Sequence, residues 1–307
     1  MSFRLFVYYC ALCGAFAAFL GWVAGRLPGQ MDKLVEAGVK GLLLGLTVAL
    51  ALSLVEACWN FSVSQLFLSV PRALVAILIS SIGGLIGGVL GQALLLYAFD
   101  FIGFVMFGWI LTGLLIGVSL AAYDLLIRLM TGADLSAALR KLLNGVLGGT
   151  AGGLLGSILY LLLGGVWELL FRNKPSAILW SPSGIGFAVL GACIGLMIGL
   201  AQVILKEAWL KVEAGFRPGR EMIISRDALT IGRAESCDIG LFGDATVEKV
   251  HARILKQGDH YLLADNGTSG GTFLNEERID GPTPLKAGDA IRVGKCVIRF
   301  QERQKKK

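Results

Sequence analysis

Long apolar runs dominate the first two-thirds of the chain. Six of them contain few charged residues, at about 5–25, 38–58, 74–98, 101–123, 142–163 and 184–205. A helix needs about 20 apolar residues to cross the roughly 30 Å hydrocarbon core of a bilayer. The pattern therefore predicts an α-helical membrane bundle of six transmembrane helices within residues 1–207.

Small residues recur in register along these runs. The stretches "CGAFAAFLG" (13–21), "GGLIGGVLG" (83–91) and "GGTAGGLLG" (148–156) have small residues at the same five positions. The alternate runs share another set, in which Gly41, Gly45 and Ala49 correspond to Gly113, Gly117 and Ala121 and to Gly191, Gly195 and Gly199. Small residues four apart let helix backbones approach closely in lipid. The register predicts a glycine-rich repeat of three tandem hairpins, with the stripes as packing surfaces.

Ionisable residues are scarce inside the predicted spans. Glu56 and Asp124 lie near the ends of the second and fourth spans, not at their centres. Paired carboxylates or histidines at mid-membrane depth usually accompany ion or substrate coupling, and no span has them. The pattern favours a membrane anchor, and a channel or transporter remains the alternative.

Charge divides the chain into two parts. Hydrophobic residues make up 55% of it and charged residues 16%. Residues 1–210 carry 11 Lys/Arg and 8 Asp/Glu, whereas the last 97 residues carry 17 and 14. The net charge of +6 is therefore shared equally, without the dense basic face of a nucleic-acid-binding protein. A water-soluble C-terminal domain is expected.

The distribution of Lys and Arg near the span ends indicates an orientation. With both termini inside, seven of these residues lie on the inner side and five on the outer side. Lys and Arg are enriched on the cytoplasmic side of membrane proteins. We expect both termini and the C-terminal domain to be cytoplasmic, where Cys237 and Cys296 would stay reduced.

The hydrophobic pattern changes after the sixth run. "KEAWLKVE" (206–213) is typical of a continued helix, and "GFRPGR" (215–220) ends regular structure, so residues 208–219 are predicted to be a helical linker and turn. Short β-branched runs separated by turn residues follow, which is typical of an all-β sandwich. The expected sandwich spans residues 220–300, and 301–307 form a basic tail.

Several motifs of the C-terminal region identify a family. They occur in the order "IGR" (231–233), "CDIGL" (237–241), "VEKVHA" (247–252), "TSGGTFLN" (268–275) and "LKAGDAIRVG" (285–294). Together they resemble the forkhead-associated (FHA) domain over roughly residues 220–300. The resemblance implies a small β-sandwich that recognises phosphothreonine peptides through loops at one end.

The resemblance also implies roles for particular residues. Arg233 matches the arginine that contacts the phosphate, and a guanidinium suits this role because its planar fork forms charge-assisted hydrogen bonds. Ser269 falls where the family has a loop Ser or Thr that touches the ligand, and His251 matches the histidine that braces the recognition loops. The turn framework of the family falls on Gly232, Gly271, Thr272 and Asn275.

Two positions depart from the family pattern. Glu248 stands where a serine usually donates a hydrogen bond to the phosphate, and a carboxylate cannot donate one. Gly270 stands where an asparagine usually bonds the ligand backbone. Lys249, next to Glu248, can supply positive charge, so the pocket is expected to be altered but usable.

The expected function is recognition, not catalysis. Two histidines, with no nucleophile elbow, P-loop or metal-ligand cluster, do not indicate an enzyme, a metal site or a cofactor. The sequence predicts a membrane-anchored signalling module that docks a phosphothreonine or acidic protein segment. The lipid bilayer is the second expected partner, nucleic acid is not one, and association into a homo-oligomer stays open.

Overall fold

The structure is a computed structural model. It describes residues 3–26, 31–59, 63–99, 103–132, 135–171, 182–204, 206–215, 217–224, 228–258 and 260–303. The chain divides into two compact units, one built mainly of helices and one built mainly of strands.

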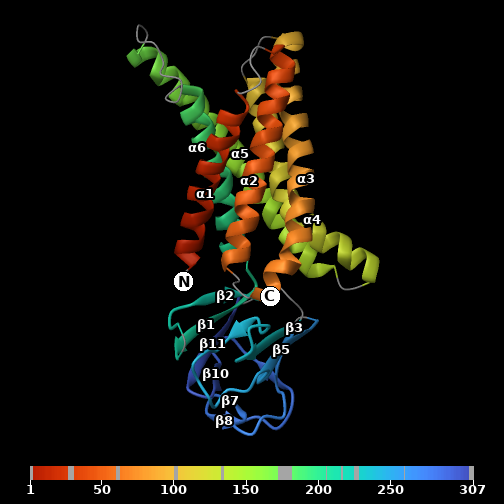
Figure 1. Ribbon diagram of the computed structural model, residues 1–307, viewed down its shortest axis with the longest axis vertical. Helices are drawn as coiled ribbons and strands as arrows, with labels where there is room; N and C mark the ends of the chain where they lie inside the picture. Colours follow the sequence, from red (N-terminus) through yellow and green to blue (C-terminus); the bar gives the residue numbers. More distant parts are fainter. Residues whose placement is uncertain are drawn as a thin grey trace. The chain divides into compact units, whose positions relative to one another are not determined.

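Six long helices run alongside one another in the helical unit (Figure 1). They are α1 (Phe3–Ala24), α2 (Lys33–Trp59), α3 (Val63–Leu94), α4 (Gly103–Thr131), α5 (Ser136–Phe171) and α6 (Pro182–Ile204), and a π-helical turn, η1 (Leu95–Phe99), continues α3. Each contains a segment long and apolar enough to cross a membrane. The prediction of six helices is confirmed, although α5 extends well beyond its predicted range of 142–163.

Close contacts between glycines join neighbouring helices of the bundle. At three equivalent positions of the glycine register, a Cβ added to one glycine would collide with the carbonyl group of a glycine on the facing helix. These pairs are Gly14 of α1 with Gly191 of α6, Gly41 of α2 with Gly84 of α3, and Gly113 of α4 with Gly149 of α5. The backbones touch because no side chain lies between them.

Other glycines connect the remaining neighbours in the bundle. Their Cβ positions would meet backbone atoms of the next helix, and the contacts are Gly21 with Leu43, Gly87 with Gly108, and Gly152 with Ile194. Each helix therefore packs against the next one in the chain, and α6 packs against α1. The six helices form a closed bundle.

Apolar side chains fill the bundle and also cover its surface. Leu44 of α2, Ile116 of α4 and Ile194 of α6 are fully buried, at 0% exposure. On the outside, Phe16 and Leu78 are 65% and 62% exposed. An exposed surface of this kind is unfavourable in water and suits contact with lipid.

The second unit is a sandwich of two β-sheets. Its strands are β1 (Ala208–Ala214), β2 (Glu221–Ile223), β3 (Ala228–Gly232), β4 (Ile239–Gly240), β5 (Ala252–Gln257), β6 (His260–Asp265), β7 (Thr272–Leu274), β8 (Glu277–Arg278), β9 (Thr283–Leu285), β10 (Ala290–Val293) and β11 (Cys296–Glu302). One sheet has the order β2-β1-β11-β10-β7-β8 and the other the order β4-β3-β5-β6-β9. Fully buried residues from both sheets, including Leu210, Ile254 and Phe300, form one core. The predicted all-β sandwich is confirmed.

The predicted helical linker at 208–219 is wrong. Ala208–Ala214 form β1, which pairs with β11 and with β2. Ala208, Leu210 and Val212 are buried at alternate positions, which is the period of a strand and not of a helix. The sandwich therefore begins at Ala208 and not at 220. It continues through Glu302, so the first residues of the predicted tail belong to β11, and residues 304–307 lie outside the described residues.

Candidate functional site

The turn after β3 lies directly against the loop that precedes β5. The amide of Arg233 donates to the carbonyl of Glu248 at 2.8 Å, and the amide of Ala234 donates to the carbonyl of Lys249 at 2.9 Å. A Cβ on Gly232 would collide with the Lys249 carbonyl, so only glycine allows this approach. The contact places Arg233, whose side chain is exposed, beside Glu248 and Lys249.

His251 connects the loop before β5 to the loop between β6 and β7. Its side chain is fully buried. Nδ1 accepts a hydrogen bond from the amide of Glu248 at 3.1 Å, so the ring proton is assigned to Nε2. Nε2 lies 3.1 Å from both the Gly271 carbonyl and the Thr268 hydroxyl. One imidazole therefore fixes the spacing of the two loops.

Asp265 anchors the loop between β6 and β7 through hydrogen bonds. Its carboxylate accepts hydrogen bonds from the hydroxyls of Thr268 and Thr272, at 2.8 and 2.6 Å, and from the Thr268 amide at 2.8 Å. Burial by itself would raise the pKa of Asp265, but the hydrogen bonds from the two threonines outweigh it and lower the pKa. The motif comparison gave no role to Asp265 or Thr268. The signal in the sequence is an Asp followed three residues later by Thr, a spacing typical of a turn closed by side-chain hydrogen bonds.

The tips of the two loops meet through Glu248 and Ser269. One carboxylate oxygen of Glu248, Oε1, accepts from the Ser269 amide at 3.0 Å and from the Ser269 hydroxyl at 3.4 Å. Both residues are exposed, as is Lys249. Within the described residues, neither the Arg233 nor the Lys249 side chain has a hydrogen bond or ion pair. The site thus presents two cations, a hydroxyl and one carboxylate to solvent.

The other residues singled out from the sequence have separate places. A Cβ on Gly270 would lie 3.5 Å from the Thr246 carbonyl oxygen, an ordinary contact, so this position has room for a side chain. Thr272 is fully buried. The side chain of Asn275 bonds Asp289 at 2.8 Å and the Ala290 amide at 2.9 Å. Asn275 therefore fixes the turn after β7 and makes no contact of this kind with the two loops.

The sandwich also matches a family model. Residues 229–294 match the model of the FHA domain. These residues form an FHA domain. The matched range contains β3 to β10 and both loops of the site. The resemblance seen in the sequence motifs is thereby supported for the C-terminal part of the chain, and the helical unit lies outside the match.

Curated relatives are similar to part of this chain. The FHA domain-containing protein FhaB of Mycobacterium tuberculosis is 26% identical over 137 residues, which are 44% of this chain and 86% of FhaB. The oxoglutarate dehydrogenase inhibitor of Corynebacterium jeikeium is 33% identical over 93 residues, which are 30% of this chain and 63% of that protein. Each of these matches leaves more than half of this chain uncovered.

Solved structures of FHA domains are similar to about a third of this chain. One is from a study of phosphothreonine-dependent FHA domain interactions, with 27% identity, coverage of 32% of this chain and 99% of that chain, and a TM-score of 0.30. Another is the FhaA FHA domain complexed with the intracellular domain of Rv3910, with 29% identity, coverage of 31% and 99%, and a TM-score of 0.28.

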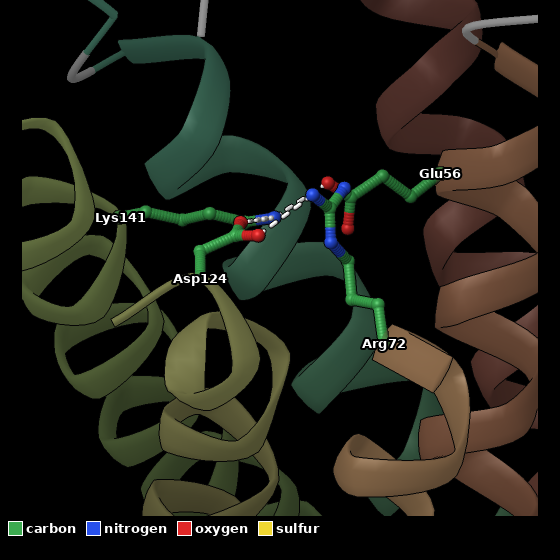
Figure 2. A network of polar contacts seen from close by, with 4 residues as sticks. All are labelled: Glu56, Arg72, Asp124 and Lys141. Carbon is green, nitrogen blue, oxygen red and sulfur yellow. Dashed lines mark hydrogen bonds and ion pairs between the residues drawn. The ribbon is translucent and has the colours of Figure 1, made fainter. Parts of the chain in front are cut away.

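A second polar cluster lies at one end of the helical bundle. Figure 2 shows Glu56, Arg72, Asp124 and Lys141 pointing toward one another from α2, α3, α4 and α5. Lys141 Nζ lies 2.6 Å from Glu56 Oε1 and 3.3 Å from Asp124 Oδ2. Arg72 Nη2 lies 2.6 Å from Asp124 Oδ1.

The composition of this cluster indicates a structural role. Two cations face two carboxylates, so the charges balance and each carboxylate has a cationic partner. In the described part of the chain, no group of three His, Cys, Asp or Glu residues could hold a metal ion. These ion pairs tie four helices together.

Proposed function

We propose that the protein is a membrane-anchored interaction protein whose FHA domain binds a phosphothreonine-containing segment of a partner. One observation carries the proposal: His251 fixes two loops that expose Lys249 and Ser269 on an FHA domain, and the turn after β3 holds Arg233 against the first of these loops. An arginine fork, an ammonium group and a hydroxyl are donors suited to a phosphate.

The relatives support recognition over catalysis. Their names describe regulators, such as an oxoglutarate dehydrogenase inhibitor and a glycogen accumulation regulator. The site itself offers donors suited to an anion, and its hydroxyl–carboxylate contact, from Ser269 Oγ to Glu248 Oε1, is long at 3.4 Å. We therefore assign a signalling role in protein–protein interaction and no enzymatic activity to this chain.

The helical unit is proposed to anchor the FHA domain in a membrane as three tandem hairpins. The glycine pairs Gly41–Gly84, Gly113–Gly149 and Gly191–Gly14 support this arrangement, because each joins corresponding positions of neighbouring hairpins. The Lys and Arg distribution favours a cytoplasmic FHA domain. Anchoring would raise the local concentration of partners on the same membrane surface.

The apolar interior favours an anchor over a channel or transporter. Leu44, Ile116 and Ile194 occupy corresponding positions of α2, α4 and α6, and all three are fully buried. A conducting path requires polar groups or water along the axis. Large apolar side chains at these positions oppose it.

Peptide binding by the full chain tests the proposal. The protein in lipid nanodiscs is titrated with a phosphothreonine peptide library and its unphosphorylated copy. We expect a preference for the phosphorylated peptides that Arg233→Ala weakens about 10- to 100-fold, because a hydrogen bond to a charged group contributes about 1.5–3 kcal/mol.

Arg253→Ala is the matched control, since Arg253 is exposed on β5 and outside the two loops. This variant should bind like the parent. Equal affinity of the parent for phosphorylated and unphosphorylated peptides would refute the proposal.

A further inference from the structure

Glu248 reaches across the candidate site from one loop to the other. Its own amide is held by His251 Nδ1 at 3.1 Å, which fixes its backbone. Its Oε1 accepts the amide proton of Ser269 at 3.0 Å and the hydroxyl of Ser269 at 3.4 Å. The carboxylate thus occupies two donors of the loop between β6 and β7.

These donors are the ones that an anionic ligand would need. An amide N–H and a hydroxyl at a loop tip bind anions, and Arg233 and Lys249 lie beside them on the neighbouring backbone. The carboxylate of Glu248, which belongs to the domain itself, therefore occupies the position that an anionic atom of a ligand would take. An incoming anion has to displace it and is repelled by it until it moves.

We propose that Glu248 is a built-in competitor that restricts the site to phosphorylated segments and excludes merely acidic ones. The inference rests on the proposed function and specifies its ligand. An aspartate or glutamate of a partner would only replace one carboxylate with another at the Ser269 donors. It would compete poorly, because Glu248 is part of the same chain and is present at a high effective concentration. A phosphothreonine carries a charge of about −1.5 to −2 at pH 7 and three acceptor oxygens, so it can engage Arg233 and Ser269 together.

The exposure of the contact makes displacement feasible. Glu248 and Ser269 are both exposed, so the carboxylate can rotate into solvent without leaving a buried charge. The His251 bond to the Glu248 amide stays intact during this rotation, because it involves only the backbone of Glu248. The loops keep their spacing when the competitor leaves.

The binding test uses three peptides of one sequence, with phosphothreonine, threonine or glutamate at the central position. They are titrated against the full chain in nanodiscs and against Glu248→Gln and Glu248→Ser. The parent should bind only the phosphothreonine peptide. Both variants should bind it about tenfold more tightly, since like-charge repulsion near solvent is about 1–2 kcal/mol, and they should also bind the glutamate peptide measurably.

Glu277→Gln is the matched control, because Glu277 is exposed on β8 and the change in net charge is the same. It should behave like the parent. A general electrostatic effect would instead improve binding in this control as much as in Glu248→Gln.

A second measurement does not depend on any peptide. In the full chain labelled with ¹⁵N-serine, the Ser269 amide signal should shift as carboxyl groups are protonated in the parent, and this shift should be absent in Glu248→Gln. Absence of the shift in the parent overturns the inference.

The outcomes separate the two proposals. Phosphopeptide binding that is equal in the parent and both variants overturns the competitor role and leaves the proposed function standing. A Glu248-dependent Ser269 shift, with no phosphopeptide binding by the parent or any variant, refutes the proposed function and supports the contact alone. A parent that binds the glutamate peptide as well as the phosphothreonine peptide overturns the selectivity.

Discussion

At the scale of single residues, Gly270 lacks the side chain that FHA domains commonly use to bond the ligand backbone. The structure has room for one, because a Cβ would make only ordinary contacts with Thr246 and His251. Gly270→Asn should therefore fold normally and tighten phosphopeptide binding about 2- to 10-fold, the value of one net hydrogen bond of about 0.5–1.5 kcal/mol. Calorimetric titration measures the affinity.

The neighbouring glycine provides the control. Gly271 has a φ of +67°, and a Cβ there would lie 2.6 Å from Arg278 Nε. Gly271→Ala should lower the melting temperature of the FHA domain, whereas Gly270→Asn should not. If both variants lower it equally, the proposed room at Gly270 does not exist.

Sequence motifs located the site residues but not their contacts. Arg233, Ser269 and His251 were assigned from the resemblance to the FHA family, and the structure places them on three adjoining segments: the turn after β3, the loop between β6 and β7, and the loop before β5. The contact between Glu248 and Ser269 could not be predicted from the sequence. The two residues are 21 positions apart, and they come together because His251 holds their two loops side by side. The sequence showed that Glu248 is an unusual residue at its position, but only the structure shows that its partner is Ser269.

At the scale of structural elements, Asp265 joins the end of β6 to the start of β7. Hydrogen bonds hold the pKa of Asp265 in the folded state below its value in the unfolded state. Its contribution to the free energy of unfolding is therefore fully present above the unfolded pKa of about 3.9 and is lost as the pH falls through the folded pKa. Asp265→Asn should lower the melting temperature at pH 7 by about 5 °C or more, since it leaves a buried donor unpaired. The difference in melting temperature between Asp265→Asn and the parent should become smaller below about pH 4.

Scanning calorimetry of the full chain between pH 3 and pH 7 measures this difference. Asp280→Asn serves as the control, because Asp280 is exposed in the turn after β8. A difference for Asp265→Asn that stays constant down to pH 3 would show that its carboxylate charge is unimportant.

Glycine contacts between helices give a second prediction at this scale. A Cβ on Gly195 of α6 would collide with the Cys10 carbonyl of α1, whereas Gly165 of α5 has no atom within 4 Å of its Cβ position. Gly195→Leu should destabilise the bundle by about 1–3 kcal/mol or more, because it forces two backbones apart. Gly165→Leu should be tolerated. Size-exclusion profiles and thermal aggregation of the detergent-solubilised variants measure the effect, and equal behaviour of both variants would contradict the packing role.

Elements were predictable where a single periodicity dominates. The six helices follow from apolar length, and the strands of the sandwich follow from short β-branched runs. β1 was predicted to be a helix because "KEAWLKVE" has good helix formers. Pairing with β11 and β2 and burial at alternate positions override that local preference.

At the scale of the whole molecule, the charged cluster is the feature that the sequence predicted least. Glu56, Arg72, Asp124 and Lys141 come from four helices, and their pairing depends on how the bundle closes (Figure 2). Glu56 and Asp124 were visible as charges near span ends. Their partners could not be inferred, because ends of different helices have no fixed spacing in sequence.

Membrane orientation is the property of the whole molecule that remains to be tested, and α2 offers a direct probe. It runs from Lys33 to Trp59, and 27 residues span about 40 Å, more than the roughly 30 Å hydrocarbon core. Lys33 and Cys58, at its two ends, are both exposed. If α2 crosses the membrane, these ends lie on opposite faces.

The Lys and Arg distribution predicts that Cys58 lies on the cytoplasmic face. In a variant with Cys58 as the single cysteine, a membrane-impermeant maleimide should label the protein only after intact cells are permeabilised. With Cys58 replaced by alanine and Lys33→Cys added, labelling should occur from outside. The reverse pattern would place the FHA domain outside the cell, and equal labelling of both variants in intact cells would show that α2 does not cross. If α3 to α6 cross as well, the FHA domain follows Cys58 by four crossings, and the proposed phosphopeptide site is then on the face that holds Cys58.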